Sequence, residues 1–293
     1  MNGCTKKASD DGEMMKNLGF AVLTIVLWSS LASLMAALKS MPPFLLTGLG
    51  LLLGGLLLAP TWRQWRLPWR VLVIGSAALF FYHAALFTAL KWAPAVSANL
   101  INYLWPLFIV VLAPLFDRQQ TLTPRTIIAA LTGFVGAALA IAGGQSLQIE
   151  TQAWFGYGLA LIAALIWSNY TLMLRRLPPF PSAAVGAFSI IAGLLALLVS
   201  GLSEARPTID ARDVLLLLLT ANGPLGVAFY CWDRAAKNLA SQTLGVLSFI
   251  TPVLSTSLLV LSSGNVLTPL LLFSAILVLT ATALVMWPVK SAR

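Results

Sequence analysis

The residues in this chain that could do chemistry are few and scattered. The 293 residues include one histidine, His83, nine aspartates and glutamates taken together, and two cysteines, Cys4 and Cys231. Two cysteines in such different surroundings cannot build a disulfide framework or a four-ligand zinc site. The sequence also has no glycine-rich phosphate loop, no His-Glu-x-x-His motif and no nucleophile elbow. We therefore expect no catalytic residues, no metal site, no cofactor and no hydrolysis of ATP.

His83 is nevertheless a candidate functional residue, because it lies near the middle of an apolar run, 70–90. A charged group at the centre of a bilayer costs about 3 kcal/mol on insertion scales, so an ionisable residue there is a candidate for function. The ordinary alternative is a neutral imidazole that donates one hydrogen bond to a neighbouring helix. Because imidazole titrates near neutral pH, His83 could instead exchange protons across the membrane.

A second set of polar residues repeats with the period of a helix. Asn99, Asn102, Tyr103 and Pro106 follow the spacing i, i+3, i+4, i+7, which places them on one helix face. Pro106 frees a backbone carbonyl about one turn earlier, near Asn102, and such a kink suits a cavity wall. The alternative is that the asparagine amides only join neighbouring helices. The same reasoning predicts bends or gates at three further residues: Gly223, Pro224 and Pro252.

Five tryptophans fall at the predicted membrane interfaces, where belt tryptophans belong: Trp62, Trp65, Trp69, Trp154 and Trp287. Two others lie away from these interfaces. Trp105 and Trp167 both fall well inside long apolar runs. They could face lipid or pack in the interior. They could also form aromatic walls for a flat ring and hold an ammonium group by cation–π contact, worth about 0.5–2 kcal/mol.

The composition indicates a membrane protein. Apolar residues make up 59% of the chain and charged residues 9%, whereas soluble globular chains have about 45–50% and about 25%. These values exclude an ordinary soluble enzyme, a disordered chain and a collagen-like chain. The net charge of +9 comes from residues scattered between apolar runs. The aromatic and basic stretch 62–70 is interpreted as an interfacial belt that contacts anionic lipid, so we expect membrane lipid and no nucleic acid as a partner.

Ten runs are long and apolar enough to cross the hydrocarbon core, which takes roughly 20 residues in a helix. They are 17–38, 42–60, 70–90, 96–116, 124–143, 154–174, 181–202, 212–232, 241–263 and 267–287. Apart from Asp213 at the start of the run 212–232, none of these runs contains an aspartate or glutamate. Since lipid offers no hydrogen bonds to the backbone, the runs predict an all-α membrane protein with ten transmembrane helices.

The distribution of basic residues predicts the orientation. If the N-terminus is cytoplasmic, only four of the 18 lysines and arginines fall in outside segments. Those four are Lys39, Lys91, Arg206 and Arg212. This bias fits the positive-inside rule with both termini in the cytoplasm. We therefore expect cytoplasmic tails at 1–16 and 289–293.

The chain shows signs of an internal duplication. Each half carries a Trp-Ser pair and, later, a lysine followed 15 residues on by a proline: Trp28-Ser29 and Trp167-Ser168, Lys91 and Pro106, Lys237 and Pro252. Five spans per half is an odd number, so the second half must be inverted. We expect repeats at 17–147 and 148–288 that enclose a central cavity near the midplane, as in many secondary transporters.

Ten spans in two halves that each open with Trp-Ser resemble the drug/metabolite transporter superfamily, and specifically its EamA-type exporters. The runs 80–83 (Phe-Phe-Tyr-His) and 99–106 (Asn-Leu-Ile-Asn-Tyr-Leu-Trp-Pro) are similar to those of aromatic amino acid exporters. The resemblance implies export of amino acids, chiefly aromatic ones, across the bacterial inner membrane by alternating access. It also implies that Tyr82 and His83 lie at the cavity. The expected substrate-binding residues are Tyr82, His83, Asn102, Tyr103, Trp105 and Trp167.

Other functions stay open at this point. Export of other small organic solutes or drugs, coupled to protons through His83, is the main alternative. A membrane-embedded enzyme would need paired carboxylates, a His/Asp cluster or a serine–lysine pair at membrane depth, which the expected spans lack. A passive channel is a third possibility, although a pseudo-two-fold arrangement favours a closed central site. We expect facilitated export, because no carboxylate is available to drive antiport. We also expect a monomer.

Overall fold

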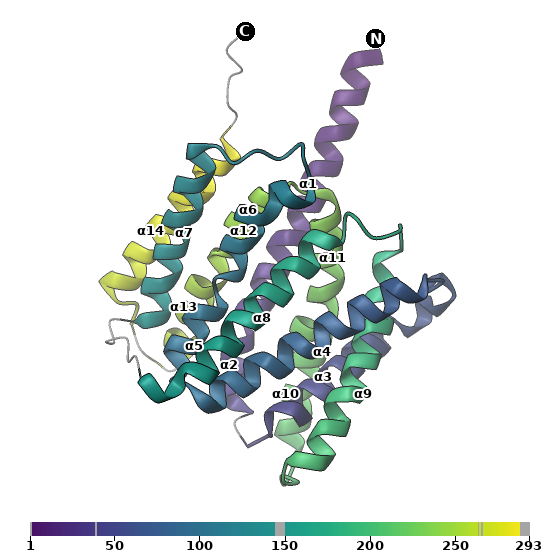
Figure 1. Ribbon diagram of the computed structural model, residues 1–293, viewed down its shortest axis with the longest axis vertical. Coiled ribbons are helices and arrows are strands. Elements are labelled where there is room, and N and C mark those ends of the chain that lie inside the picture. The colour runs from purple at the N-terminus through teal and green to yellow at the C-terminus, as the bar shows by residue number, and fades with distance from the viewer. Residues whose placement is uncertain (1, 39, 144–149, 263, 265, 288–293) are drawn as a thin grey trace.

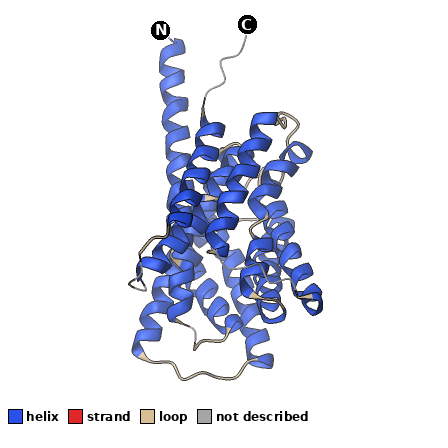
Figure 2. Cartoon of the chain, turned by 90° about the vertical axis from the view of Figure 1, so that its left-hand side faces the viewer, coloured by secondary structure: helices blue, strands red, loops and turns tan. Residues whose placement is uncertain are grey.

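The structure is a computed structural model of the chain, and it describes residues 2–38, 40–143, 150–262, 264 and 266–287. Within the first helix, side chains are described from Gly12 onward. Every regular element in these ranges is a helix, and Figures 1 and 2 show the helices packed side by side. The predicted all-α architecture is therefore confirmed for these ranges. The expected repeat boundary at 147/148 and the expected tail 289–293 lie outside them.

The helices follow one another through both halves of the chain. The first half contains α1 (Asn2–Ser29), α2 (Leu31–Ala37), α3 (Pro43–Leu57), the 3-10 helix η1 (Ala59–Gln64), α4 (Trp69–Trp92), α5 (Ala95–Asn102), α6 (Trp105–Phe116) and α7 (Pro124–Ala142). The second half contains the 3-10 helix η2 (Thr151–Ala153), α8 (Trp154–Met173), the 3-10 helix η3 (Ser182–Ala184), α9 (Val185–Ser203), α10 (Ala211–Asn222), the π-helical segment η4 (Gly223–Val227), α11 (Ala228–Asn238), α12 (Ser241–Ser248), α13 (Ile250–Ser262) and α14 (Pro269–Met286).

Nine helical stretches of the described chain are long and apolar enough to cross a membrane. They are Gly12–Ala37, Trp69–Trp92, Ala95–Phe116, Pro124–Ala142, Thr151–Met173, Ser182–Ser203, Ala211–Asn238, Ser241–Ser262 and Pro269–Met286. They indicate a multi-pass membrane protein. The remaining expected span, 42–60, contains α3, whose 15 residues rise only about 22 Å against a core of ~30 Å. A tenth crossing and the inverted arrangement of the halves stay predictions.

Local sequence explains where several helices begin and end. Both α7 and α14 start at a proline, Pro124 and Pro269, whose fixed φ and missing N–H suit the first turn. The threonine before each proline, Thr123 and Thr268, caps its helix by accepting a backbone N–H with its hydroxyl. Gly143 ends α7 with a φ of 57°, a left-handed conformation that favours glycine.

Two of the candidate spans are interrupted shortly before a proline. In one, α5 ends at Asn102, and Pro106 is the second residue of α6. In the other, α12 ends at Ser248, and Pro252 is the third residue of α13. In both cases the first helix ends four residues before the proline, where the pyrrolidine ring would clash with the backbone carbonyl. The two interruptions therefore have the same local cause.

A third span changes its helical type instead of breaking. Gly223 and Pro224 begin η4, which joins α10 to α11, and the N–H of Ala228 donates to the carbonyl of Gly223. Such π-helical turns re-aim the backbone groups of a helix and are frequent at functional sites. Figures 1 and 2 also show that α1 begins and α14 ends at the same end of the bundle.

Candidate functional site

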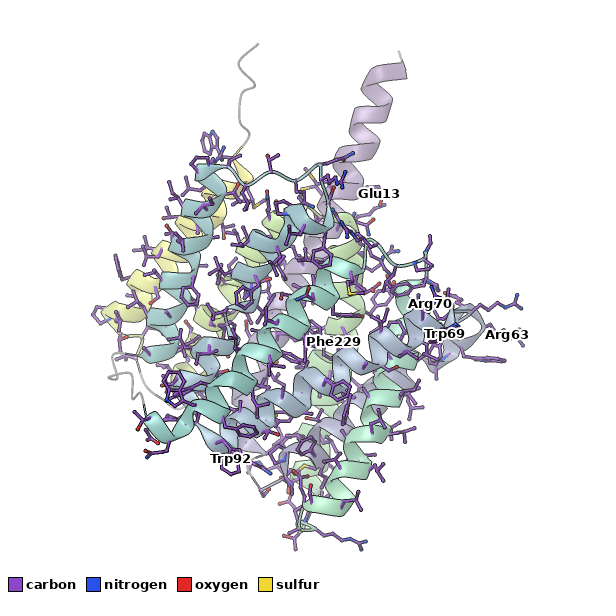
Figure 3. The ribbon with its side chains drawn as sticks, in the orientation of Figure 1. Glu13, Arg63, Trp69, Arg70, Trp92 and Phe229 are labelled. Carbon is purple, nitrogen blue, oxygen red and sulfur yellow. The ribbon has the colours of Figure 1, made fainter. Side chains whose placement is uncertain are left out.

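Five aromatic side chains meet inside the bundle and form what we call the aromatic cluster: Trp28, Trp105, Trp167, Phe229 and Trp232. Trp28 is its hub, because its ring centroid lies 5.0 to 6.3 Å from those of the other four. The rings come from α1, α6, α8 and α11, and Figure 3 shows Phe229 in the middle of the bundle. Trp105 and Trp167 are 4% and 3% exposed, so they face the interior and not lipid.

Tryptophans expected at the membrane interfaces lie on the outside of the molecule. Four of them are exposed: Trp62, Trp69, Trp154 and Trp287. The fifth, Trp65, is half-buried and donates its indole N–H to the Thr61 hydroxyl. Figure 3 shows Trp69 and the exposed Trp92 at different edges of the bundle, far from Phe229. The chain thus separates peripheral tryptophans from the buried ones.

The Trp-Ser pair of α1 connects this helix to two spans of the second half. Trp28 donates its indole N–H to the carbonyl of Pro224 in η4 at 3.1 Å. The Ser29 hydroxyl donates to the Ile25 carbonyl of its own helix at 2.6 Å and lies 3.2 Å from the carbonyl of Thr251, the residue before Pro252. The hub of the aromatic cluster is therefore held by a backbone carbonyl of the π-helical turn, and the residue after it lies against the start of α13.

Tyr82, Asn102 and Trp167 lie together beside the aromatic cluster. The Tyr82 ring centroid is 5.2 Å from that of Trp167, and the two planes are tilted by 41°. Asn102 donates its amide N–H to the Tyr82 hydroxyl at 3.5 Å, a long hydrogen bond. The other end of this amide, Asn102 Oδ1, is buried and accepts no hydrogen bond from any described residue. A buried acceptor without a donor is costly, so this atom is suited to a ligand N–H.

His83 is buried at 8% exposure and bonds to its own helix. Its Nδ1 lies 2.7 Å from the Leu79 carbonyl, which can only accept, so Nδ1 carries the proton. The ring is flanked by those of Tyr82, Phe87 and Phe229. No carboxylate lies within ion-pair distance of His83 in the described residues. The hydrogen bond expected to a neighbouring helix is instead made within α4.

The four residues expected on one helix face differ in their burial. Asn102 and Pro106 are buried, and Tyr103 is half-buried at the break between α5 and α6, close enough to Tyr82 for the two phenol groups to interact electrostatically. Asn99 is exposed and does not share the burial of Asn102 and Pro106. The backbone of α12 comes very close to Pro106, because a Cβ on Gly245 would lie 2.8 Å from the Pro106 carbonyl oxygen.

Three members of this site escaped the sequence analysis as functional candidates: Trp28, Phe229 and Trp232. The sequence pattern marks Trp28 as part of the duplication, and its position in an apolar run matches that of Trp105. Phe229 and Trp232 lie near the end of an apolar run, where aromatic residues are ordinary. Their only available signal was their spacing of three residues, which places both on one face of α11.

One expectation about the spans is wrong. We expected no acid at membrane depth, but α11 continues to Asn238, beyond the expected end of that span at 232. Asp233 therefore lies inside the candidate span and is 1% exposed. Its charge is balanced by Lys237 one turn later, with 2.6 Å between Oδ2 and Nζ. The turn after 232 contains the charged residues Asp233, Arg234 and Lys237, so the apolar run ends there although the helix continues.

An apolar groove lies on the other side of the Trp28 hydrogen bond. It has a volume of about 600 Å³ and is bounded by α1, α2, α10, η4 and α13, with Leu27 and Pro224 among its walls. Ser33, which also lines it, has a buried hydroxyl that makes no hydrogen bond with the described residues. Because Pro224 also accepts the Trp28 N–H, the groove and the aromatic cluster share a wall.

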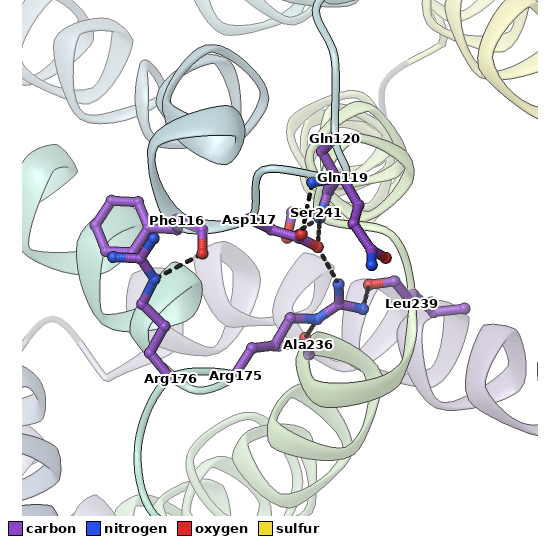
Figure 4. Close-up of polar contacts among 9 residues, drawn as sticks. All are labelled: Phe116, Asp117, Gln119, Gln120, Arg175, Arg176, Ala236, Leu239 and Ser241. Carbon is purple, nitrogen blue, oxygen red and sulfur yellow. Dashed lines mark hydrogen bonds and ion pairs between the residues drawn. The ribbon is translucent and has the colours of Figure 1, made fainter.

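A network of charged groups joins the ends of α6, α8 and α11 (Figure 4). Arg175 donates to the carbonyl of Ala236 at 3.1 Å and to that of Leu239, and lies 3.6 Å from Asp117 Oδ2. Arg176 donates to the Phe116 carbonyl at 2.6 Å. Helix C-termini attract cations because their last carbonyls are free. We call Asp117, Gln120, Arg175 and Arg176 the arginine network.

The network shifts the ionisation of its members. Hydrogen bonds from the Gln120 amide and the Gln119 backbone N–H, with a smaller contribution from Arg175, hold the pKa of Asp117 below its usual value. Partial burial lowers the pKa of Arg175, and the charge of Asp117 opposes this effect. The two groups thus favour each other's charged form.

Comparison with known proteins decides the family. The sequence model of the EamA-like transporter family matches residues 15–142 and again 154–287. The chain belongs to the EamA-like transporter family. It therefore belongs to a family of membrane transporters, and its aromatic cluster is built from helices of both matched segments.

Curated relatives of the chain carry a common name. The chain is 36% identical over 255 residues to the aromatic amino acid exporter YddG of Ancylobacter novellus. This alignment covers 84% of the chain and 87% of the relative. The chain is 27% identical over 263 residues to the exporter of the same name from Escherichia coli, covering 81% and 85%. A solved crystal structure matches with a TM-score of 0.88 at 32% identity, covering 93% of this chain and 96% of the other. These names support an exporter and indicate a transporter, not an enzyme.

Proposed function

We propose that this EamA-family chain is a secondary exporter of amino acids, chiefly aromatic ones, that works by alternating access in the bacterial inner membrane. The observation that carries the proposal is the aromatic cluster, which brings buried rings from four helices together beside the unpartnered Asn102 Oδ1. The names of the relatives support the same substrate class.

The proposal includes two inverted five-helix repeats, 17–147 and 148–288, with both tails in the cytoplasm. The two separate matches to one family model support a duplication. The two helix interruptions support it as well, because each falls four residues before a proline, at Asn102 and at Ser248. The common end at which α1 begins and α14 ends supports an even number of crossings (Figures 1 and 2).

Recognition of the substrate would use both parts of the site. The flat ring of an aromatic amino acid packs against tryptophan rings, and each such contact is worth about 0.5–1.5 kcal/mol. The ammonium group donates to Asn102 Oδ1 and to the Tyr82 hydroxyl and lies over a ring face, with a further ~0.5–2 kcal/mol from cation–π attraction. The cluster is closed upon itself here, since its rings touch one another. Substrate entry would therefore separate Trp28 from its partners.

The test is counterflow in proteoliposomes with labelled phenylalanine, tryptophan and threonine. We expect saturable exchange of the aromatic substrates, which distinguishes a carrier from a channel. Trp105→Ala and Trp167→Ala should each raise the KM about two- to tenfold, because about 0.5–1.5 kcal/mol of ring contact is lost. Trp154→Ala is the matched control, since Trp154 is 67% exposed.

Two results would contradict the proposal. Flux that rises linearly with concentration to high levels indicates a pore. Unchanged KM values in both cluster variants, with the protein correctly inserted, remove the tryptophans from the substrate site.

A further inference from the structure

The chain buries one carboxylate, Asp233, near the end of a candidate membrane span, and nothing in the proposed function uses it. Asp233 lies on α11 within the candidate span Ala211–Asn238 and is 1% exposed. The other described acids are in helix ends or loops, or are at least half-exposed. Because a charged group at membrane depth is costly, such a residue is a candidate for function together with its partner.

The ion pair with Lys237 uses only one of the two oxygens of the Asp233 carboxylate. Lys237 Nζ lies 2.6 Å from Oδ2. Oδ1 is buried and makes no hydrogen bond of good geometry with the described residues, although Ser182 of η3 lies beside the carboxylate. Buried carboxylates that serve only to hold a fold normally have their oxygens saturated with donors. An unsaturated Oδ1 is a place where a proton can bind.

Lys237 has two partners that do not depend on the charge of Asp233. Its ammonium group donates to the Phe180 carbonyl at 3.0 Å and lies 3.3 Å from the centroid of the Phe180 ring. A carbonyl dipole and an aromatic face both stabilise a cation. Lys237 therefore keeps favourable contacts when Asp233 becomes neutral. Protonation of the carboxylate does not leave the charge of the lysine buried without a partner.

The other groups around Asp233 connect it to the aromatic cluster. The titratable or charged groups that face it are Lys237 and Arg234 of its own helix and Tyr170 of α8. The Tyr170 ring packs on Trp167, with 5.7 Å between centroids. The residue before Asp233, Trp232, is a member of the cluster. A change at Asp233 therefore reaches the substrate site through directly adjoining residues of α8 and α11.

We propose that Asp233 is a proton-binding site of the transport cycle. Oδ1 takes up one proton while the site faces one side of the membrane and releases it to water on the other side, and the charge of the carboxylate alternates between −1 and 0. Only an O–H bond forms and breaks. The inference rests on the proposed function, because it couples one proton to each exported amino acid.

Proteoliposomes with labelled phenylalanine separate coupling from binding. The membrane potential is clamped, a pH difference is imposed, and the equilibrium distribution of phenylalanine is measured beside its counterflow. For one proton per substrate, the wild-type distribution should shift about tenfold per unit of pH difference. Asp233→Asn should retain counterflow and give a distribution ratio near one. Glu13→Gln is the matched control, because this acid is 64% exposed and pairs with Lys16.

A structural role for the ion pair makes a different prediction. If Asp233→Asn fails to fold, the double variant Asp233→Asn/Lys237→Met removes both charges and restores a neutral pair of side chains. Counterflow without a response to pH in this variant supports the proton site, whereas a normal response to pH overturns it. A response that survives in Asp233→Asn and disappears in His83→Gln also overturns it.

Failure of this inference can be told from failure of the proposed function. Wild-type protein that exchanges phenylalanine but does not respond to the pH difference contradicts only the proton site. Wild-type protein without any counterflow of aromatic amino acids contradicts the export function itself.

Discussion

Asp117 shows how a single side chain can hold the end of a helix in place. Its carboxylate accepts hydrogen bonds from the Gln119 backbone N–H and the Gln120 amide, both at 3.0 Å, and faces Arg175. These donors hold its pKa below the usual value. A group whose folded pKa is depressed stabilises the fold above its unfolded pKa and loses that contribution as the pH falls through the folded pKa.

This sign gives a prediction for acid pH. We expect Asp117→Asn to lower the thermal midpoint of the purified protein at pH 7, where the wild-type carboxylate is charged. The difference between variant and wild type should shrink as the pH falls below about 4 and the wild-type carboxyl protonates. Thermal unfolding in detergent from pH 7 to pH 3 measures it, with Gln119→Ala as control because only the backbone of Gln119 takes part. A difference that is the same at every pH contradicts this account.

Individual residues also show what a sequence can predict about a site. Trp105 and Trp167 stood out because a tryptophan in the middle of an apolar run is unusual, and the structure brings both into the interior. Trp28 had the same signal, but its role as hub depends on α11, some 200 residues away along the chain. Asn102 Oδ1 lacks a donor only because of how α4 and α5 pack. Contacts between distant segments carry no local signature in the sequence.

At the scale of elements, α3 and α9 pack so closely that their backbones touch. A Cβ placed on Gly193 would lie 2.7 Å from the Leu52 backbone nitrogen and 2.9 Å from the Gly48 carbonyl oxygen. Backbone atoms cannot swing aside as side chains do. Small residues at such interfaces let membrane helices approach, which is a main source of their association in lipid.

Two glycines of α9 therefore give a matched pair of variants. Gly193→Ala should lower the thermal midpoint, because overpacking typically costs about 1–3 kcal/mol. Gly201→Ala on the same helix should leave the midpoint unchanged or raise it slightly, since nothing lies within 4 Å of its Cβ and alanine favours helix by up to about 1 kcal/mol. Thermal unfolding of both variants in one detergent measures the contrast. Equal midpoints for the two variants are inconsistent with the close approach.

Helix interruptions were predictable only in part. Pro106 and Pro252 each end the preceding helix four residues earlier, as the clash with a carbonyl requires. Pro114 lies within α6, which continues to Phe116. The proline pattern alone therefore indicates where a helix can break but does not decide whether it does.

For the whole molecule, α1 begins and α14 ends at the same end of the bundle (Figure 1). The side of the membrane on which the tails lie therefore determines the side of each loop. If the tails are cytoplasmic, the loop after α6 lies inside and the loop after α9 lies outside. We expect a cysteine at Thr208 to react with a membrane-impermeant thiol reagent added to intact cells, and a cysteine at Gln119 to react only after the membrane is opened. Both residues are exposed.

The background for this labelling lacks the native thiols, through Cys4→Ser and Cys231→Ala. Cys231 is 2% exposed, so its removal affects packing and must be checked by the thermal midpoint. Labelling of both positions from the same side would show that the two loops do not lie on opposite faces, and the proposed inverted repeats would fall with it.

If α3 makes the predicted tenth crossing, its short length has a consequence for the lipid around the protein. At about 22 Å it falls roughly 8 Å short of the hydrocarbon thickness, and it is followed by η1, whose Trp62 is 64% exposed with the Arg63 guanidinium over its ring. A hydrophobic mismatch of this kind is relieved by local thinning of the bilayer, at a fraction of a kcal/mol per ångström. Annular lipids next to α3 would then be compressed on one flank of the molecule alone, and longer acyl chains would tilt the protein in its membrane.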